Sequence, residues 1–352
     1  MKDEMTSGER WEHFYGDGKI DRVPVLSFAT MYAGRQKGLT SNEYYFDIAK
    51  GYHAQNEFIR KWGFDDSPCL DIPHAEMLDF GGEVGFSTSN RVELPWVKKY
   101  PIQSEQEAEN YTLPPIENRL YTQKRIEFYD YAKSLGQTGV GIGLGSPFTL
   151  VGYLVETSLF MKWLVKRPDL IFHLLKIMEE YLTQTADILI ERYGVENCSA
   201  SANVPFESND LISAKMFEKY SLPGLVHMYQ MARGKGISNC NLHICGRHMK
   251  TLHFFKELKL NNRSFISTDE LNDIEKVAEI LGAGNVIAGN VSCKLLVSGK
   301  PKDVYRESAN IINRMKYHDG GFVLMPSCDL PIDTKLENLK AMLQAARDNS
   351  FN

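Results

Sequence analysis

The sequence lacks any long hydrophobic run and has few cysteines. No stretch of the 352 residues approaches the roughly 18 apolar residues that a membrane-spanning helix needs. The first residues, from Met1 to Ser7, contain no apolar core of the kind found in signal peptides. The six cysteines are scattered along the chain, which is unlike the cysteine framework of a small secreted domain. We therefore expect a cytoplasmic protein without membrane partners, whose reduced cysteines are able to bind metal.

An excess of positive charge is also missing. The chain has 40 Lys and Arg against 45 Asp and Glu, a net charge of −5, which argues against a nucleic-acid partner. A glycine-rich dinucleotide loop is missing too. The glycines from Gly139 to Gly145 alternate with other residues and do not follow the GxGxxG spacing. This segment is more typical of a strand that packs closely against its neighbours. No internal repeat or low-complexity tract is evident.

What the sequence does contain is a regular alternation of strand and helix patterns from Gly139 onward. Such alternation with short links predicts a parallel sheet with helices outside it. The strands that we expect in this part lie at residues 139–145, 197–202, 238–243, 264–267, 286–288 and 322–325. A strand at 23–28 and one more from the irregular stretch 64–103 would bring the number to eight, which is the number for a (β/α)8 barrel. We therefore predict an α/β fold, with residues 1–352 forming a single TIM barrel domain that has an N-terminal elaboration. Residues 1–22 are expected to be an N-terminal extension.

The expected helices follow from apolar periodicity, cap residues and Gly or Pro punctuation. We expect a loop at 32–40 and an irregular segment at 64–103. The helices are expected at residues 41–62, 119–135, about 150–160, 168–193, 212–234, 249–258, 274–281, 303–316 and 335–347.

The strongest chemical signal lies in the segment Asn239-Cys-Asn-Leu-His-Ile-Cys-Gly246. His243 and Cys245 are two residues apart, so on a strand both side chains would face the same way. Imidazole and thiolate are good zinc ligands, and catalytic zinc sites usually have three protein ligands and one open position. Cys328, which follows the last expected strand, is our candidate for the third ligand. The sequence thus predicts a Zn²⁺ site made of His243, Cys245 and Cys328.

Other polar residues follow strands at what would be the same rim, where barrel active sites form. Asp269 is expected to orient a zinc-bound histidine or to contact substrate, although a structural carboxylate bound to loop amides is an equal alternative. Glu207 is a candidate catalytic residue or exchangeable ligand, and Asn290 is a candidate cofactor contact. Cys293 lies near the rim but carries no pattern.

The remaining cysteines have simpler interpretations. A local four-ligand zinc site could combine Cys240 and His248 with the His243–Cys245 pair. Strand parity argues against it, because Cys240 would face away from His243. Cys69 and Cys198 are expected to be small buried hydrophobic residues.

Three longer motifs carry a resemblance to a known family. The segment from Gly145 to Glu156 has the form G-x-P-[FW]-T-L-x-x-Y-x-x-E. The segment from Asp210 to Phe217 is similar to D-x-[IL]-S-P-x-x-F, with Ala214 in place of proline. Val286–Val291 contains a G-N-V turn. With these motifs the chain resembles the uroporphyrinogen decarboxylase superfamily of barrels, over most of its length.

Within that superfamily, His243-x-Cys245-Gly with Cys328 resembles the zinc methyltransferase branch, of the methylcobalamin:coenzyme M methyltransferase type. The resemblance implies Zn²⁺ bound by these three residues and a corrinoid, methylcobalamin, as methyl donor or acceptor. It also implies two partners, a corrinoid protein and a small thiol or methylated small molecule. A homodimer is left open. The decarboxylases carry an N-terminal R-Q-A-G-R-Y-L-P-E-Y motif, of which this chain has only Ala33-Gly-Arg35-Gln, so Arg35 is a candidate cofactor contact.

The first functional hypothesis is therefore a zinc-dependent corrinoid methyltransferase. One alternative is a metal-free lyase that decarboxylates a tetrapyrrole with the help of Arg35. A second is a corrinoid or zinc binder without catalytic activity. A zinc hydrolase ranks last, because hydrolytic zinc sites favour His and carboxylate ligands over two cysteines.

Overall fold

The structure is a computed structural model that describes residues 3–16, 18–349 and 351. The chain folds as two compact units. The first comprises Met1–Asp71, Thr88–Glu93 and Asn262–Asn352 and is called the terminal unit here. The second comprises Ile72–Ser87 and Leu94–Asn261 and is called the central unit. In both units parallel strands alternate with helices.

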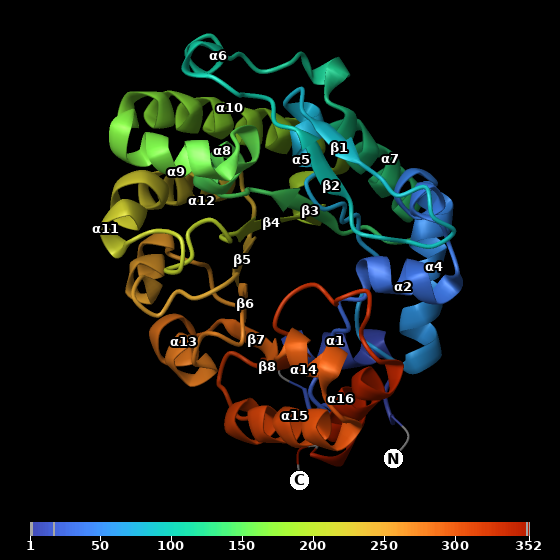
Figure 1. The fold of residues 1–352 in the computed structure, drawn as a ribbon. Coiled ribbons are helices and arrows are strands. Elements are labelled where there is room, and N and C mark those ends of the chain that lie inside the picture. Colours follow the sequence, from blue (N-terminus) through green and yellow to red (C-terminus); the bar gives the residue numbers. More distant parts are fainter. Residues whose placement is uncertain (1–2, 17, 350, 352) are drawn as a thin grey trace. The chain divides into compact units, whose positions relative to one another are not determined.

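The central unit is built on three parallel strands (Figure 1). β3 (Val140–Gly143) pairs with β4 (Cys198–Asn203), and β4 pairs with β5 (Asn239–Ile244). Glycine, serine and alanine dominate β3 and β4, which leaves little side-chain bulk on these strands. All three strands were predicted to within two residues at each end.

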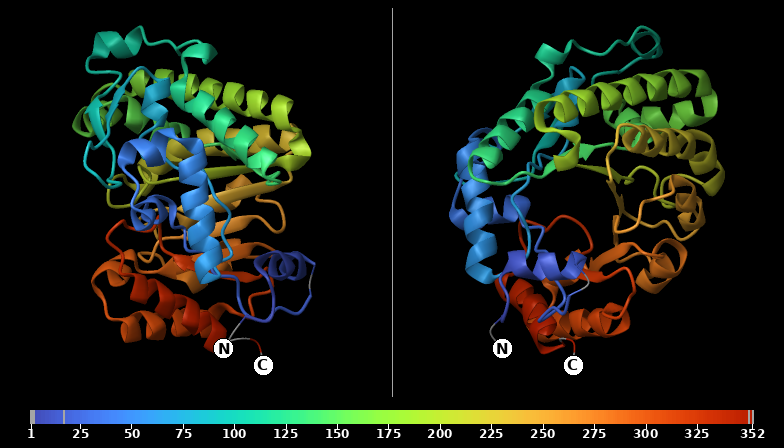
Figure 2. Two further views of the ribbon diagram at one scale, coloured as in Figure 1. Left: turned by 90° about the vertical axis from the view of Figure 1, so that its right-hand side faces the viewer. Right: turned by 180° about the vertical axis from the view of Figure 1, so that it is seen from behind.

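The helices of the central unit precede β3, connect the strands and follow β5. They are α5 (Glu76–Asp79), α6 (Glu105–Glu109), η1 (Ile116–Asn118), α7 (Leu120–Ser134), α8 (Pro147–Leu154), α9 (Thr157–Lys166), α10 (Pro168–Tyr193), η2 (Val195–Asn197), α11 (Ala214–Met216), η3 (Phe217–Ser221), α12 (Leu222–Gly234) and η4 (Leu252–Leu258). The long helix α10, drawn in light green, packs on α8 and against β3 (Figures 1 and 2). Its bounds are those predicted, because Pro168 suits the first turn and Gly194 ends the helix.

Two predicted helices of this unit are interrupted in the structure. The helix expected at about 150–160 is divided between α8, which begins earlier at Pro147, and α9. The division arises because Glu156 caps α9 by accepting hydrogen bonds from the amides of Ser158 and Leu159. The helix expected at 249–258 is the 3₁₀ segment η4. Both differences arise from side-chain and turn geometry that apolar periodicity does not report.

The irregular stretch before β3 contributes a small hairpin. β1 (Glu83–Gly85) and β2 (Trp96–Lys99) pair antiparallel in a sheet of their own. The expectation that this stretch supplies one of the parallel barrel strands is therefore wrong. Gly85 lies so close to Trp96 that an added Cβ would be 2.3 Å from the indole ring, so the hairpin is fixed by this contact.

The terminal unit has a second set of three parallel strands. β6 (Phe265–Thr268), β7 (Val286–Val291) and β8 (Phe322–Pro326) pair in that order. The predicted strand at 23–28 is present only as a single parallel bridge between Val25 and Leu324 of β8. All residues of β7 and β8 are buried, which explains why they are continuous apolar runs with almost no polar alternation.

The helices of the terminal unit surround these strands. They are α1 (Ser7–Tyr15), α2 (Thr30–Lys37), α3 (Ser41–Phe46), α4 (Ile48–Trp62), α13 (Ile274–Leu281), α14 (Cys293–Ser298), α15 (Pro301–Met315) and α16 (Leu336–Asp348). The helices α15 and α16 lie side by side (Figure 1). None of the helices in the described part of the chain has both the length and the apolar character that crossing a bilayer requires.

The loop predicted at 32–40 is wrong, since α2 covers most of it. Gly34 was taken as a breaker, but an added Cβ there would be 2.4 Å from the Tyr44 ring, so this glycine permits close helix packing. The helix predicted at 41–62 is broken at Asp47, whose carboxylate accepts a hydrogen bond from the Lys50 amide and caps α4.

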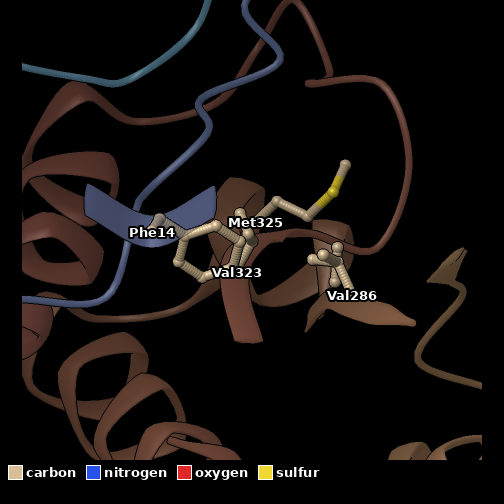
Figure 3. Close-up of a cluster of buried hydrophobic side chains, with 5 residues drawn as sticks. Phe14, Val286, Val323 and Met325 are labelled. Carbon is tan, nitrogen blue, oxygen red and sulfur yellow. The ribbon is translucent and has the colours of Figure 1, made fainter. Parts of the chain in front are cut away.

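The predicted N-terminal extension contributes to the core of the terminal unit. Phe14 of α1 packs with Val286 and Ala288 of β7 and with Val323 and Met325 of β8 (Figure 3). These five side chains are at most 8% exposed.

An ionic network fixes the same N-terminal segment. Asp65 accepts hydrogen bonds from Arg10 at 2.6 Å and from Arg22 at 2.7 Å, and all three side chains are buried. Arg10 also binds Asp21, and Asp3 binds Arg22. Residues 3–16 and 18–22 are therefore an integral part of this unit.

Candidate functional site

The predicted pair His243 and Cys245 lies at the carboxyl end of β5 in the central unit. His243 pairs with Asn203 of β4, and Cys245 follows the last residue of the strand. Leu242 and Ile244 are buried, whereas His243 and Cys245 are both half-buried. The alternation puts the imidazole and the thiol on one face of the strand, as predicted, and each offers one ligand atom to a metal.

The loop after Cys245 is tied to the loop after β4. Gly246 has φ +81°, and an added Cβ would be 3.0 Å from Ser208 Oγ, so only glycine suits this turn. The Asn209 amide donates to Arg247 O at 2.6 Å, and the Lys250 amide donates to Asn209 Oδ1 at 2.9 Å. These bonds fix the backbone on the carboxyl side of Cys245.

Cys240 and His248 have structural surroundings instead. His248 is buried, and its Nε2 donates to the carbonyls of Cys245 at 2.9 Å and Val204 at 3.1 Å. Burial lowers the pKa of His248 to about 4, although these hydrogen bonds oppose the shift, so the ring is neutral at pH 7. Cys240 is fully buried on the other face of β5, and burial raises the pKa of its thiol. This arrangement opposes the local four-ligand alternative.

Glu207 lies in the loop after β4 and is fully buried. Its carboxylate accepts hydrogen bonds from the hydroxyls of Ser146, Thr149 (2.7 Å) and Ser221 (3.0 Å). Burial raises the pKa of Glu207, and these hydrogen bonds work in the opposite direction. Two of the three donors belong to the Gly145–Glu156 motif, so the carboxylate links that motif to the loop after β4.

In the terminal unit, Cys328 follows the carboxyl end of β8 and is half-buried. The Ser327 amide donates to Val291 O at 2.8 Å, which continues the β7–β8 ladder to the residue before Cys328. The Cys293 thiol contacts the carbonyls of Cys328 and Asp329, each at 3.8 Å. Burial raises the pKa of Cys293 to about 11. The side chain of Cys293 is therefore a neutral thiol at pH 7 that contacts the backbone of Cys328.

A pair of carboxyl groups next to Cys328 was not predicted from the sequence. The Thr30 hydroxyl donates to Asp329 Oδ1 at 2.8 Å. Burial raises the pKa of Asp329, and it raises the pKa of Asp71 to about 6, partly offset by a hydrogen bond between the two carboxyl groups. Asp329 directly follows Cys328, which was an available signal, but its pairing with Asp71 spans most of the chain and leaves no local pattern.

The other predicted residues of this unit have well-defined partners. Asp269 Oδ1 accepts from the Leu271 amide at 2.9 Å, while Asn290 Nδ2 donates to the carbonyls of Asp269 (3.2 Å) and Asn272 (3.1 Å). The Asn290 amide therefore holds the loop after β6.

Arg35, on α2, donates from Nη1 to Val92 O and from Nη2 to Asp333 Oδ1, both at 3.1 Å. The guanidinium thus joins α2 to the segment 88–93 and to the loop that follows β8. The role of Arg35 as a cofactor contact stays a prediction.

The predicted site residues divide between the two units. His243, Cys245 and Glu207 belong to the central unit, and Cys328, Asp269, Asn290 and Arg35 belong to the terminal unit. The three predicted metal ligands share half-burial and a position just before or after a strand's carboxyl end. One imidazole and two thiols are a donor set that suits zinc and leaves a fourth position for substrate. The residues present therefore fit the implied metal.

Comparison with known proteins identifies the family. The family model described as "Uroporphyrinogen decarboxylase (URO-D)" matches residues 6–349. This chain belongs to that family. The resemblance carried by the three sequence motifs is thereby confirmed.

The family includes relatives with a methyltransferase name. A methylcobamide:CoM methyltransferase MtaA of Methanosarcina barkeri is 28% identical over 295 residues, which is 80% of this chain and 78% of the relative. A methylcobamide:CoM methyltransferase MtbA of Methanosarcina acetivorans is 24% identical over 358 residues, 99% of both chains.

A solved structure gives the same fold. The "methyltransferase from Methanosarcina mazei" aligns over 98% of this chain and 99% of its own, with a TM-score of 0.74 and 21% identity. Fold neighbours in this family are TIM barrels, so the predicted α/β class and barrel type of fold are confirmed.

Proposed function

We propose that this protein is a zinc-dependent methyltransferase that moves a methyl group between a corrinoid and the sulfur of a small thiol. The observation that carries the proposal is the His243–Cys245 pair, two metal-type ligands on one face at the end of β5. Support also comes from relatives named methylcobamide:CoM methyltransferase. The alignments with this chain cover 78% or more of the length of these relatives.

The proposed zinc ligands are His243, Cys245 and Cys328, and their union in one site is part of the proposal. In each case the residue lies at the carboxyl end of a parallel strand, which is the end where barrel enzymes carry their active sites. A bound zinc ion would supply one effect, a lower pKa of a substrate thiol, so that the thiol binds as a thiolate at neutral pH.

The surrounding residues have positioning roles in this proposal. The Ser208–Asn209 segment holds the backbone after Cys245, and Cys293 supports the backbone of Cys328. We propose that Asp269 orients the histidine ligand or contacts substrate, and that Asn290 acts through Asp269 by holding its carbonyl. Glu207 and Arg35 keep their proposed roles in catalysis and in binding the corrinoid.

The proposed partners follow from the same chemistry. A corrinoid is a large, flat cofactor, so a corrinoid protein would present it at the strand ends, where loops vary freely. The second substrate is a small thiol, or a methylated small molecule if the reaction runs in reverse. We further propose that residues 1–352 form one barrel domain that works in the cytoplasm, where thiols stay reduced.

The test is methyl transfer from free methylcobalamin to a panel of small thiols. The reaction is monitored through the change in absorbance of the corrinoid. Wild type is expected to demethylate the corrinoid in a thiol-dependent manner, and His243→Ala is expected to lose at least ~100-fold in rate because a ligand is missing. Cys198→Ser is the matched control, since Cys198 lies at the opposite, amino end of β4 and its thiol donates to Gly194 O. No transfer with any thiol, or loss of carboxyl groups from uroporphyrinogen as CO2 instead, would contradict the proposal.

A further inference from the structure

A cavity of about 460 Å³ lies in the terminal unit, at the opposite ends of the strands from Cys328. Arg263, just before β6, and Phe322, the first residue of β8, both line it. Its size falls in the usual range for small-molecule sites, ~300–1,000 Å³. β8 has five residues, so its two ends are separated by four steps of ~3.3 Å, which is about 13 Å. A ligand in the cavity would therefore not occupy the proposed metal site.

The inner wall of the cavity is apolar and fixed. Phe14 and Phe322 are 8% and 2% exposed, and Phe14 belongs to the core cluster of β7 and β8 (Figure 3). Gly321 lies between β8 and the cavity with φ +92°, and an added Cβ would be 2.5 Å from the Phe14 ring. Ile20 adds a further apolar side chain. The wall is thus built from side chains that the core holds in place, and a side chain at position 321 would clash with the Phe14 ring.

The rim of the cavity is mainly cationic. Lys19, Arg263 and Lys316 line it, whereas Asp319 is the one carboxylate among the lining residues that the structure describes. Asp319 has local partners, since it accepts from the Gly320 amide at 2.9 Å and lies 3.5 Å from His318 Nδ1.

The charge of this rim contrasts with that of the whole chain. Among the described residues that line the cavity there are three cationic side chains and one carboxylate, while the full chain has a net charge of −5. A local positive field beside a fixed apolar wall selects for a ligand that carries both kinds of group.

We propose that this cavity is a second ligand site, which binds a small organic anion. The ligand has an aromatic or branched aliphatic body, which contacts Phe14, Ile20 and Phe322. It also has an acidic group, a carboxylate, phosphate or sulfonate, which the rim lysines attract. The site is independent of the proposed methyl transfer, because none of its lining residues belongs to the metal-ligand set.

The test uses 8-anilinonaphthalene-1-sulfonate, a fluorescent probe with an aromatic body and one sulfonate, titrated into the full-length protein. Saturable binding of one probe per chain is expected. Lys316→Glu and Lys19→Glu should each weaken it about tenfold, since each reverses a charge near the acidic group. Lys302→Glu is the matched control: Lys302 is exposed at the start of α15, about 20 Å along the helix from Lys316. Its binding should equal that of wild type.

A neutral probe distinguishes an anion-binding site from a nonspecific apolar surface. N-phenyl-1-naphthylamine has the same ring system without the sulfonate, and it should bind at least about tenfold more weakly. The proposal is overturned by any of three results: no saturable binding of the sulfonate, equal binding of both probes, or equal affinities of the Lys316 and Lys302 variants. Zinc content and methyl transfer, measured on the same samples, should not change, so failure of this proposal is distinct from failure of the proposed function.

Discussion

At the scale of single residues, Glu207 is a buried carboxylate that links the loop after β4 to the Gly145–Glu156 motif. It lies in the central unit with no exposed surface, and three hydroxyl groups donate to it. Burial raises the pKa of Glu207, which disfavours the charged form, and the hydroxyls compensate. Any role as a metal ligand would require the carboxylate to leave these donors.

Replacement of Glu207 by alanine should therefore cost stability first. Three buried hydroxyls would lose their shared acceptor, and an unsatisfied buried polar group costs about 1–3 kcal/mol. We expect the free energy of unfolding in urea to fall by roughly 3 kcal/mol or more. Zinc content should be retained if the carboxylate is structural. A stable variant that loses zinc would instead assign Glu207 as a ligand.

The cysteines differ in how far burial raises the pKa of their thiols, and chemical labelling can measure this difference. Burial raises the pKa of Cys69, Cys198, Cys240 and Cys293, so these four are thiols at neutral pH. Thiolates are the reactive form. After zinc removal with a chelator, iodoacetamide at pH 7 should label Cys245 and Cys328 before the other four, as mapped by peptide mass spectrometry. Added zinc should protect both. Equal labelling of the buried thiols, or no protection by zinc, would contradict this expectation.

At the scale of elements, the loops after β4 and β5 form one bonded platform beside Cys245. Asn209 makes three of the hydrogen bonds that connect these loops. Its backbone amide donates to Arg247 O, its Oδ1 accepts from the Lys250 amide, and its Nδ2 donates to Thr251 Oγ1 at 3.2 Å. Two of these three hydrogen bonds use the Asn209 side chain, so the platform depends on this residue.

Asn209→Ala should therefore weaken metal binding without touching a ligand. Loss of a group that positions ligands typically costs 10–100-fold in metal affinity. We expect a loss in that range in a competition with a zinc-binding dye. Asp210→Ala, which removes only an exposed ion pair with Arg247 at 3.3 Å, is the control and should stay near wild type. If both variants bind zinc like wild type, the platform does not position Cys245.

Elements with strong local signals could be predicted from the sequence. The bounds of α10 and α13 were predicted without error, because proline, glycine and an aspartate cap mark their ends. The helices α2 and α14 were missed, because Gly34 looks like a breaker and α14 has only six residues. The His243–Cys245 face followed from strand parity. The hydroxyl partners of Glu207 and the Asp71–Asp329 pair could not be predicted, since they join segments far apart in the sequence.

At the scale of the whole molecule, the terminal unit joins both ends of the described chain through ion pairs. Asp3 binds Arg22 and Arg347, and Asp21 binds Arg10. Burial by itself would raise the pKa of Asp3, but hydrogen bonds from Arg347 and Arg22 outweigh it and hold the pKa below its usual range. The pKa of Asp21 is lowered in the same way by Arg10.

These lowered values predict the acid sensitivity of the fold. A carboxyl group whose pKa is lower in the folded state stabilises the fold above its unfolded pKa of about 3.9, and this contribution is lost as the pH falls through the folded value. The free energy of unfolding should therefore decrease from about pH 4 downward. In Arg347→Ala the decrease should be smaller, because Asp3 loses one partner, while exposed Lys302→Ala should follow wild type. Identical pH profiles for all three proteins would refute this origin.

The central claim is that His243 and Cys245 of one unit and Cys328 of the other bind one zinc ion. The most direct test is zinc per chain by elemental analysis, in protein purified without added metal. Wild type should contain about one zinc, Cys328→Ser should lose most of it, and Cys198→Ser, which changes a thiol at the amino end of β4, should keep it. Full zinc retention in Cys328→Ser, or no zinc uptake by wild type when zinc is added, would contradict the account.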